Sequence, residues 1–129
     1  MLSSMPMLGG VRLAPLPVSV LPSTMVVREP AGEDEYGGSC AEPYEIAHVR
    51  FSAASEFTLQ QSGGAQAGYV FAEGAKGVIY VDAANSSPAR EVPERSVVTV
   101  DDGEPMMVRR VTRCDHLDGS CHHWELEVS

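Results

Sequence analysis

The chain has 129 residues, which suits one domain, or one domain with an arm. Its net charge of −9 argues against a protein that grips nucleic acid, because neutralising phosphates requires clustered Lys and Arg. A content of 12 Gly and 9 Pro, together with the lack of good helical runs, favours β structure with long loops.

Cysteine usage and hydropathy indicate a reducing, aqueous compartment. The 3 cysteines are an odd number, unlike a secreted disulfide framework, so we expect reduced thiols in a cytosol. No apolar run approaches the roughly 18 residues of a membrane span, so we expect no membrane partner. The N-terminus lacks a basic region followed by an apolar one, so we expect no signal peptide.

Residues 1–22 are apolar but repeatedly interrupted by proline, at Pro6, Pro15, Pro17 and Pro22. Proline fixes φ and is excluded from helix interiors and central strands, so this segment is predicted to be an extended arm. Such an arm packs either on its own domain or on a neighbouring protein, and our hypothesis is that the neighbour dominates.

Residues 23–129 are predicted to form a single domain in which β-rich runs alternate with turns. The predicted strands are residues 24–29, 45–51, 77–82, 96–100, 106–113 and 123–129. A bulge is expected between Ile46 and Phe51, the two anchors of the second strand. The fold class is therefore all-β, a small antiparallel β-barrel or sandwich of about six strands with a long loop and an extended N-terminal arm.

The C-terminal strand candidate carries the clearest pattern. Trp124, Leu126 and Val128 alternate with polar residues, so these three should face the core and the polar residues should face solvent. The turn signal Asp118-Gly119 precedes this run and follows another strand candidate, which predicts a hairpin. We expect this hairpin to be the element against which the rest of the chain closes.

Residues 60–76 are rich in Gly, Gln and Ala and are predicted to form a long mobile loop. A loop of this length in a small domain is typically functional or disordered. Within it, the apolar run Tyr69-Val70-Phe71 could dock on another surface. The candidate residues of this loop are Gln60, Gly63, Gly64, Tyr69 and Phe71.

Five potential metal ligands lie close together in the hairpin: Cys114, His116, Cys121, His122 and His123. Their spacing differs from the usual Cys-x₂₋₄-Cys and His-x₃₋₅-His arrangements, and alternation sends His122 and His123 to opposite faces. We therefore expect no metal and no cofactor, with His123 on the solvent face. Two alternatives stay open. One is a small zinc-stabilised binding module that uses Cys114, His116, Cys121 and His122, and the other is a cross-strand Cys114–Cys121 disulfide.

Catalysis is not expected. Cys40, Cys114, His48 and Asp82 supply the residue types of a hydrolase, but no local motif gives them roles. Gly63-Gly64 is not followed by the Lys-Ser/Thr of a phosphate-binding loop.

The basic cluster Arg109-Arg110-Arg113 lies on a predicted strand, where Arg109 and Arg113 share one face. These arginines either pair with Glu125 and Glu127 across the hairpin or contact a neighbouring subunit. In the second case the partner is an acidic loop formed by Glu33, Asp34 and Glu35.

The chain resembles the minor capsid proteins of tailed bacteriophages, which we relate to the head-closure, or stopper, proteins of the phage neck. The resemblance rests on three stretches. They are the proline-interrupted arm that ends in Val26-Val27, the strand and Asn-Ser-x-Pro turn of residues 79–88, and residues 98–128, which end in His-His-Trp-Glu-Leu-Glu-Val. The hairpin Cys/His cluster and the Gly-rich loop lie outside this likeness.

This resemblance implies a non-enzymatic β-barrel in the virion neck, assembled in the host cytoplasm. Its subunits form a homo-oligomeric ring, for which we expect a hexamer with a dodecamer as the alternative. The ring lies beneath the portal and adaptor proteins, holds packaged double-stranded DNA without specific binding, and offers a face to the tail terminator or tail tube. A loop enters the channel, and an acidic lumen repels DNA and keeps it mobile.

Overall fold

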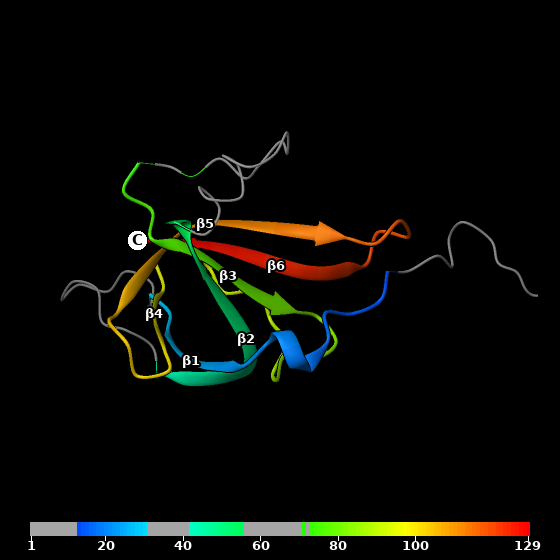
Figure 1. Ribbon diagram of the computed structural model, residues 1–129, viewed down its shortest axis with the longest axis horizontal. Coiled ribbons are helices and arrows are strands. Elements are labelled where there is room, and N and C mark those ends of the chain that lie inside the picture. Colours follow the sequence, from blue (N-terminus) through cyan, green and yellow to red (C-terminus); the bar gives the residue numbers. More distant parts are fainter. Residues whose placement is uncertain (1–12, 31–41, 56–70, 72) are drawn as a thin grey trace, which may run out of the picture.

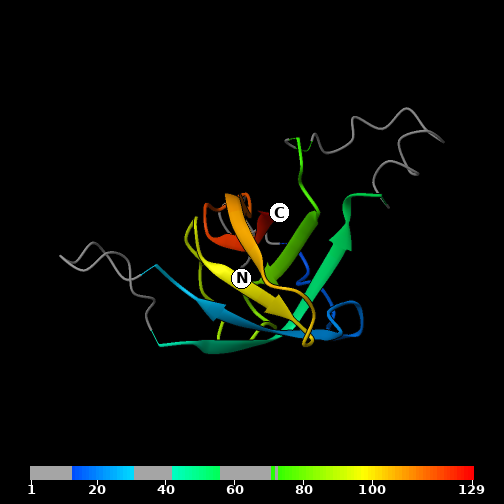
Figure 2. The same ribbon diagram turned by 90° about the vertical axis from the view of Figure 1, so that its left-hand side faces the viewer.

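The chain folds into a closed antiparallel β-barrel of six strands (Figures 1 and 2). The computed structural model describes residues 13–30, 42–55, 71 and 73–129. The strands are β1 (Ser23–Arg28), β2 (Tyr44–Ala53), β3 (Gly77–Asp82), β4 (Val97–Val100), β5 (Met106–Asp115) and β6 (Cys121–Val128). They close in the order β1-β2-β3-β6-β5-β4. The all-β prediction is confirmed, and the barrel replaces the alternative of a sandwich.

Alternation along the strands builds one core inside the barrel. Residues of all six strands and Val92 of the β3–β4 connection contribute to it, namely Met25, Val27, Ile46, Val49, Ile79, Val81, Val92, Val98, Met106, Val108, Leu126 and Val128. Leu126 and Val128 are fully buried, whereas Trp124 on the same face is only partly buried and packs against the core edge. Its indole Nε1 donates to Glu91 Oε1 at 3.1 Å, so the ring keeps one polar edge toward the surface.

Bulges change which way side chains face at two strand pairs. In β2 the register with β1 skips His48, whose φ is 62°, between Ile46 and Phe51 where a bulge was expected. Between β5 and β6 the register shifts twice, at Arg109 and at His122. The bulge at His122 leaves Cys114 opposite His123 and places Cys121 opposite Asp115.

The β5–β6 hairpin forms the longest feature of the molecule and projects past the other strands (Figure 1). Gly119 takes the left-handed conformation with φ 89°, and its N–H donates to the carbonyl of His116 at 3.0 Å. Asp118 Oδ1 accepts from the backbone N–H and the hydroxyl of Ser120. The predicted Asp-Gly turn is therefore present, with Gly119 in the left-handed conformation and the Asp118 side chain bonded to the backbone two residues on.

The outer face of β6 is not a solvent face, contrary to the expectation from its polar residues. Glu127 is 1% exposed and forms an ion pair with Arg110, which stands opposite it on β5, at 2.5 Å. The side chains of His123 and Glu125 are 15% and 20% exposed. These polar groups can be buried because each one has a polar partner.

The described part of the arm, residues 13–22, lies against its own barrel. It includes the 3₁₀ turn η2 (Val18–Val20), and Leu21 behind it is buried. For these residues the contact is with the chain's own domain, which was the other alternative for the arm. Within the described residues, no helix is long and apolar enough to cross a membrane.

Two predicted regions fall outside the described residues. They are the acidic residues Glu33, Asp34 and Glu35, and most of the loop, including Gln60, Gly63, Gly64 and Tyr69. Phe71 of the loop is described and is partly buried.

Candidate functional site

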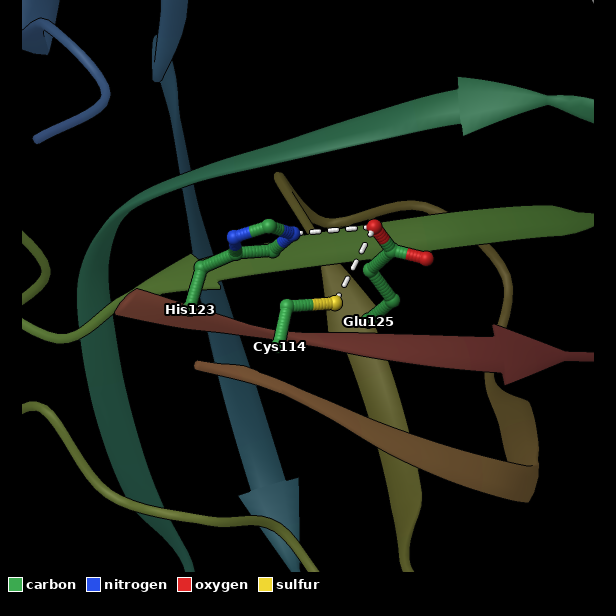
Figure 3. Close-up of side chains that lie close together, drawn as sticks. All are labelled: Cys114, His123 and Glu125. Atoms are coloured by element: carbon green, nitrogen blue, oxygen red, sulfur yellow. Dashed lines mark hydrogen bonds and ion pairs between the residues drawn. The ribbon is translucent and has the colours of Figure 1, made fainter. Parts of the chain in front are cut away.

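Three side chains of different chemistry converge on the outer face of the β5–β6 hairpin: Cys114, His123 and Glu125 (Figure 3). Cys114 stands directly opposite His123 across the strand pair, and Glu125 follows His123 by two residues on the same face. The distance from His123 Nε2 to Glu125 Oε2 is 2.9 Å, and from Cys114 Sγ to the same oxygen it is 3.6 Å. One carboxylate oxygen thus accepts from both an imidazole and a thiol.

The site favours a charged carboxylate and a neutral thiol. Burial raises the pKa of the Cys114 thiol to about 11, and the neighbouring charge of Glu125 adds to this effect. The hydrogen bond from His123 lowers the pKa of Glu125, while burial opposes that shift. A thiol with such a raised pKa is a poor free nucleophile.

His122 contacts His123 directly, which corrects the expectation that the two rings lie on opposite faces. The bulge at His122 adds one residue to β6, so the alternation breaks there. The Nδ1 atoms of the two rings are 2.8 Å apart, and the ring planes meet at 81°. His123 also lies 6.0 Å, centroid to centroid, from the ring of Tyr80 on β3.

The rings connect this cluster to the arm. His122 Nε2 lies 2.7 Å from the carbonyl oxygen of Ala14, and the backbone N–H of Leu13 donates to His116 Nδ1 at 2.9 Å. The edge of the His116 ring meets that of His122 at 5.0 Å between centroids. A groove of about 450 Å³ lies between the arm and the hairpin here.

Asp82 at the end of β3 fixes the arm a second time. It is fully buried, and its Oδ1 accepts from the backbone N–H of Leu16 at 2.9 Å. Its Oδ2 accepts from the N–H groups of Ala84 and Asn85, and the Asn85 side chain donates back to the Leu16 carbonyl at 2.7 Å. Asp82, which supplies one of the residue types of a hydrolase, therefore stabilises a turn and binds the arm.

The four residues of the zinc alternative, Cys114, His116, Cys121 and His122, do not form one cluster in the described structure. Among the described residues, Cys114 groups with His123 and Glu125, not with His116, Cys121 and His122. Cys121 Sγ is directed at the carbonyl oxygen of His123, at 3.5 Å. The alternative of a Cys114–Cys121 disulfide is also wrong for this structure, since both thiols are free, Cys114 stands opposite His123, and Cys121 stands opposite Asp115.

A family profile described as minor capsid protein matches residues 17–128, from the η2 region to the end of β6. The chain belongs to the minor capsid protein family. This membership gives the protein a structural role in the phage virion. No curated protein and no solved structure matches the chain.

The Asn-Ser-x-Pro turn of this minor capsid protein has a visible structural task. The Ser86 hydroxyl accepts from the Asp82 N–H at 2.8 Å and donates to the carbonyl of His48 at the β2 bulge. Ser87 exchanges two backbone hydrogen bonds with Ala47. The turn thereby connects the bulge of β2 and the end of β3 to the arm.

The arginines of the basic cluster in this minor capsid protein have different partners. Arg110, not Arg109 or Arg113, forms the cross-hairpin pair with Glu127. Arg109 donates to Ser129 Oγ at 2.7 Å, and Arg113 donates to Asp115 Oδ1 at 2.7 Å. The bulge at Arg109 interrupts the alternation on which the predicted shared face depended. An intersubunit role for Arg109 and Arg113 stays a prediction.

Proposed function

We propose that this minor capsid protein is a ring subunit of the phage neck, lying beneath the portal and adaptor, that retains packaged DNA and offers a docking face to the tail. The family match over residues 17–128 is the observation that carries the proposal, because it supports a structural part of the virion rather than an enzyme. The small closed barrel, and the relationship that we draw between this family and the head-closure proteins of the phage neck, support the finer assignment.

Charge supports a channel role. A net charge of −9 makes the surface repel a DNA duplex, so a ring of such subunits would let DNA pass without holding it. Non-specific DNA binding depends on phosphate neutralisation by Lys and Arg, and this chain has 9 of these against 18 acidic residues.

Exposed apolar side chains support contacts with a neighbouring copy. In the described residues, the exposed large hydrophobic side chains are those of Leu13, Val18, Val20 and Leu117, all in the arm or the hairpin turn. The arm residue Leu13 lies near the hairpin turn, because its N–H donates to Nδ1 of His116, the residue that precedes Leu117. Leu117 is 76% exposed, and exposed apolar residues near one another are typical of interaction surfaces. A ring requires such a patch to meet a different patch of the next subunit.

The test adds the untagged full-length protein to DNA-filled heads that carry the portal and adaptor, and then images the necks. Wild-type protein should add a ring, and Leu117→Asp should fail to add it while keeping its circular dichroism spectrum. Ala89→Asp, at an exposed position on the β3–β4 connection, is the matched control and should assemble normally. Absence of wild-type protein from the neck would refute the proposed function, whereas normal assembly of Leu117→Asp would refute only the assigned interface.

A further inference from the structure

The Cys114–His123–Glu125 cluster has the donor atoms and the spacing of a transition-metal site. One sulfur, one imidazole nitrogen and one carboxylate oxygen lie within 4.8 Å of one another. Zinc–ligand distances of about 2.3 Å to sulfur and about 2.0–2.1 Å to nitrogen or oxygen give tetrahedral edges of about 3.6 Å for S···O and about 3.3 Å for N···O. The S···O separation here is already 3.6 Å, and the N···O separation of 2.9 Å needs to open only slightly.

The hydrogen bonds of the two histidine rings also indicate a place for a cation. Three contacts run from the Ala14 carbonyl through His122 and His123 to Glu125, and each of them needs one N–H. Two neutral imidazoles carry only two N–H groups. Without a cation, the third contact requires an extra proton shared by the ring pair.

The Ala14 carbonyl fixes the direction of this chain. A carbonyl only accepts, so the ring of His122 donates through Nε2 and accepts through Nδ1. When both rings are neutral, His123 then donates through its own Nδ1, and its Nε2 keeps a lone pair that faces Cys114 and Glu125. A metal ion at that point takes the place of the third N–H, and two neutral rings then satisfy every remaining contact.

We propose that Cys114 Sγ, His123 Nε2 and a Glu125 carboxylate oxygen bind one divalent transition-metal ion of the zinc type, with His122 orienting His123. The mixed sulfur, nitrogen and oxygen set selects zinc-like ions over magnesium and calcium, which prefer oxygen ligands alone. Binding of the ion releases the proton of the Cys114 thiol to solvent, and the resulting thiolate and the Glu125 carboxylate together balance the two positive charges of the ion. Water completes the fourth position of the tetrahedron.

The ion would join β5 to β6 and, through His122, the arm to the hairpin. Metal-bound histidines usually donate their other N–H to a partner that fixes the ring, and loss of such a partner weakens metal binding by about 10–100-fold. Here that partner is His122, which is itself held by Ala14. This inference is independent of the proposed neck function, because a protein that forms no ring could still bind the ion.

The test uses untagged full-length protein that has been treated with a chelator and reducing agent and is then titrated with Co²⁺. The expected result is a saturable 1:1 near-ultraviolet thiolate-to-cobalt band, with visible absorption of tetrahedral strength, that is abolished when Zn²⁺ is added. Cys114→Ser should remove the thiolate band. Cys121→Ser is the matched control and should keep it, since Cys121 Sγ is directed at the His123 carbonyl rather than at the cluster.

His122→Gln tests the orienting residue, and the expected effect is a 10–100-fold higher dissociation constant with the same spectrum. Circular dichroism of each variant verifies that it is folded. Absence of the thiolate band in folded wild-type protein would overturn the proposal. Equal loss in Cys114→Ser and Cys121→Ser, or equal affinity in wild type and Cys114→Ser, would overturn it as well.

Discussion

Replacing Arg110 by alanine tests the burial of charge on the outer face of the barrel. Glu127 is 1% exposed and pairs with Arg110 at 2.5 Å, while the Arg110 side chain is half exposed. Removing one partner of a buried ion pair costs about 3–5 kcal/mol, because the other charge stays desolvated. Because the Arg110 side chain is half exposed, solvent screens its attraction to Glu127, and removing Arg110 costs less than in a fully buried pair. We therefore expect Arg110→Ala to lower the free energy of unfolding by about 2–3 kcal/mol.

Urea unfolding followed by the fluorescence of Trp124, the single tryptophan, measures this change. For a urea m-value of about 1–3 kcal/mol/M, the midpoint should fall by roughly 1–2 M at unchanged m. Arg109→Ala is the control, since this neighbouring side chain is exposed and donates to the Ser129 hydroxyl rather than to a buried carboxylate; it should change stability by at most about 0.5 kcal/mol. Equal midpoints for Arg110→Ala and Arg109→Ala would refute the reasoning.

Four further predictions concern other parts of the chain. Trp124→Ala should cost about 2–3 kcal/mol in urea unfolding, less than the 3–5 kcal/mol typical of a fully buried aromatic, and wild-type stability would contradict its contact with the core. Deletion of residues 1–22 should lower the thermal midpoint of the isolated protein, because it removes the arm contacts of the barrel, whereas an unchanged midpoint would mean that the arm adds no stability. Burial, followed by its hydrogen bond to Glu29, raises the pKa of Tyr44, so alkaline absorbance titration of the folded protein should show a phenol that ionises above the ordinary tyrosine pKa, and Glu29→Gln should bring its ionisation to lower pH. Shortening the loop by residues 63–68 removes about 20 Å of contour; it should leave folding intact but let filled heads expose DNA to nuclease, and full DNA retention with normal ring assembly would mean that the loop does not hold the genome.

Local pattern was sufficient to predict most of the strands. The continuous apolar run of β3 and the alternation of Trp124, Leu126 and Val128 each identify a strand, because a period of two has one structural meaning. The Asp118-Gly119 pair predicted the turn, because its conformational requirement is local. Barrel closure brings β1 against β4 across most of the chain, and no local pattern encodes that pairing.

The cluster on the hairpin could not be assembled from spacing alone. A single bulge at His122 breaks the alternation of β6, so the ring of His122 reaches that of His123. The register of the hairpin places Cys114 opposite His123 rather than opposite Cys121. Glu125 was predicted to face solvent and was missed as a site residue. The signal for it was present, because in a strand Glu125 shares a face with His123 at i+2.

Burial of Glu127 was missed for a different reason. A polar residue between apolar ones normally marks the solvent side of a strand. The pairing of Glu127 with an arginine across the hairpin was therefore expected on a solvated face, because the pattern does not show that this face is covered. The arm was also ambiguous in sequence, since its contacts with Asp82 and His122 use its backbone rather than its side chains.

The closed strand order has a consequence for how copies of this protein can associate. Each of the six described strands is hydrogen-bonded to a strand on both sides, so sheet extension by a second chain is blocked wherever that pairing is complete. β4 pairs with β5 only at Met106 and Met107, however, and among the described strands the rest of β5 has β6 alone as its partner. This outer part of the hairpin is therefore an edge along which a second chain can add a strand. Elsewhere on the barrel, copies can associate only through side chains and chain termini.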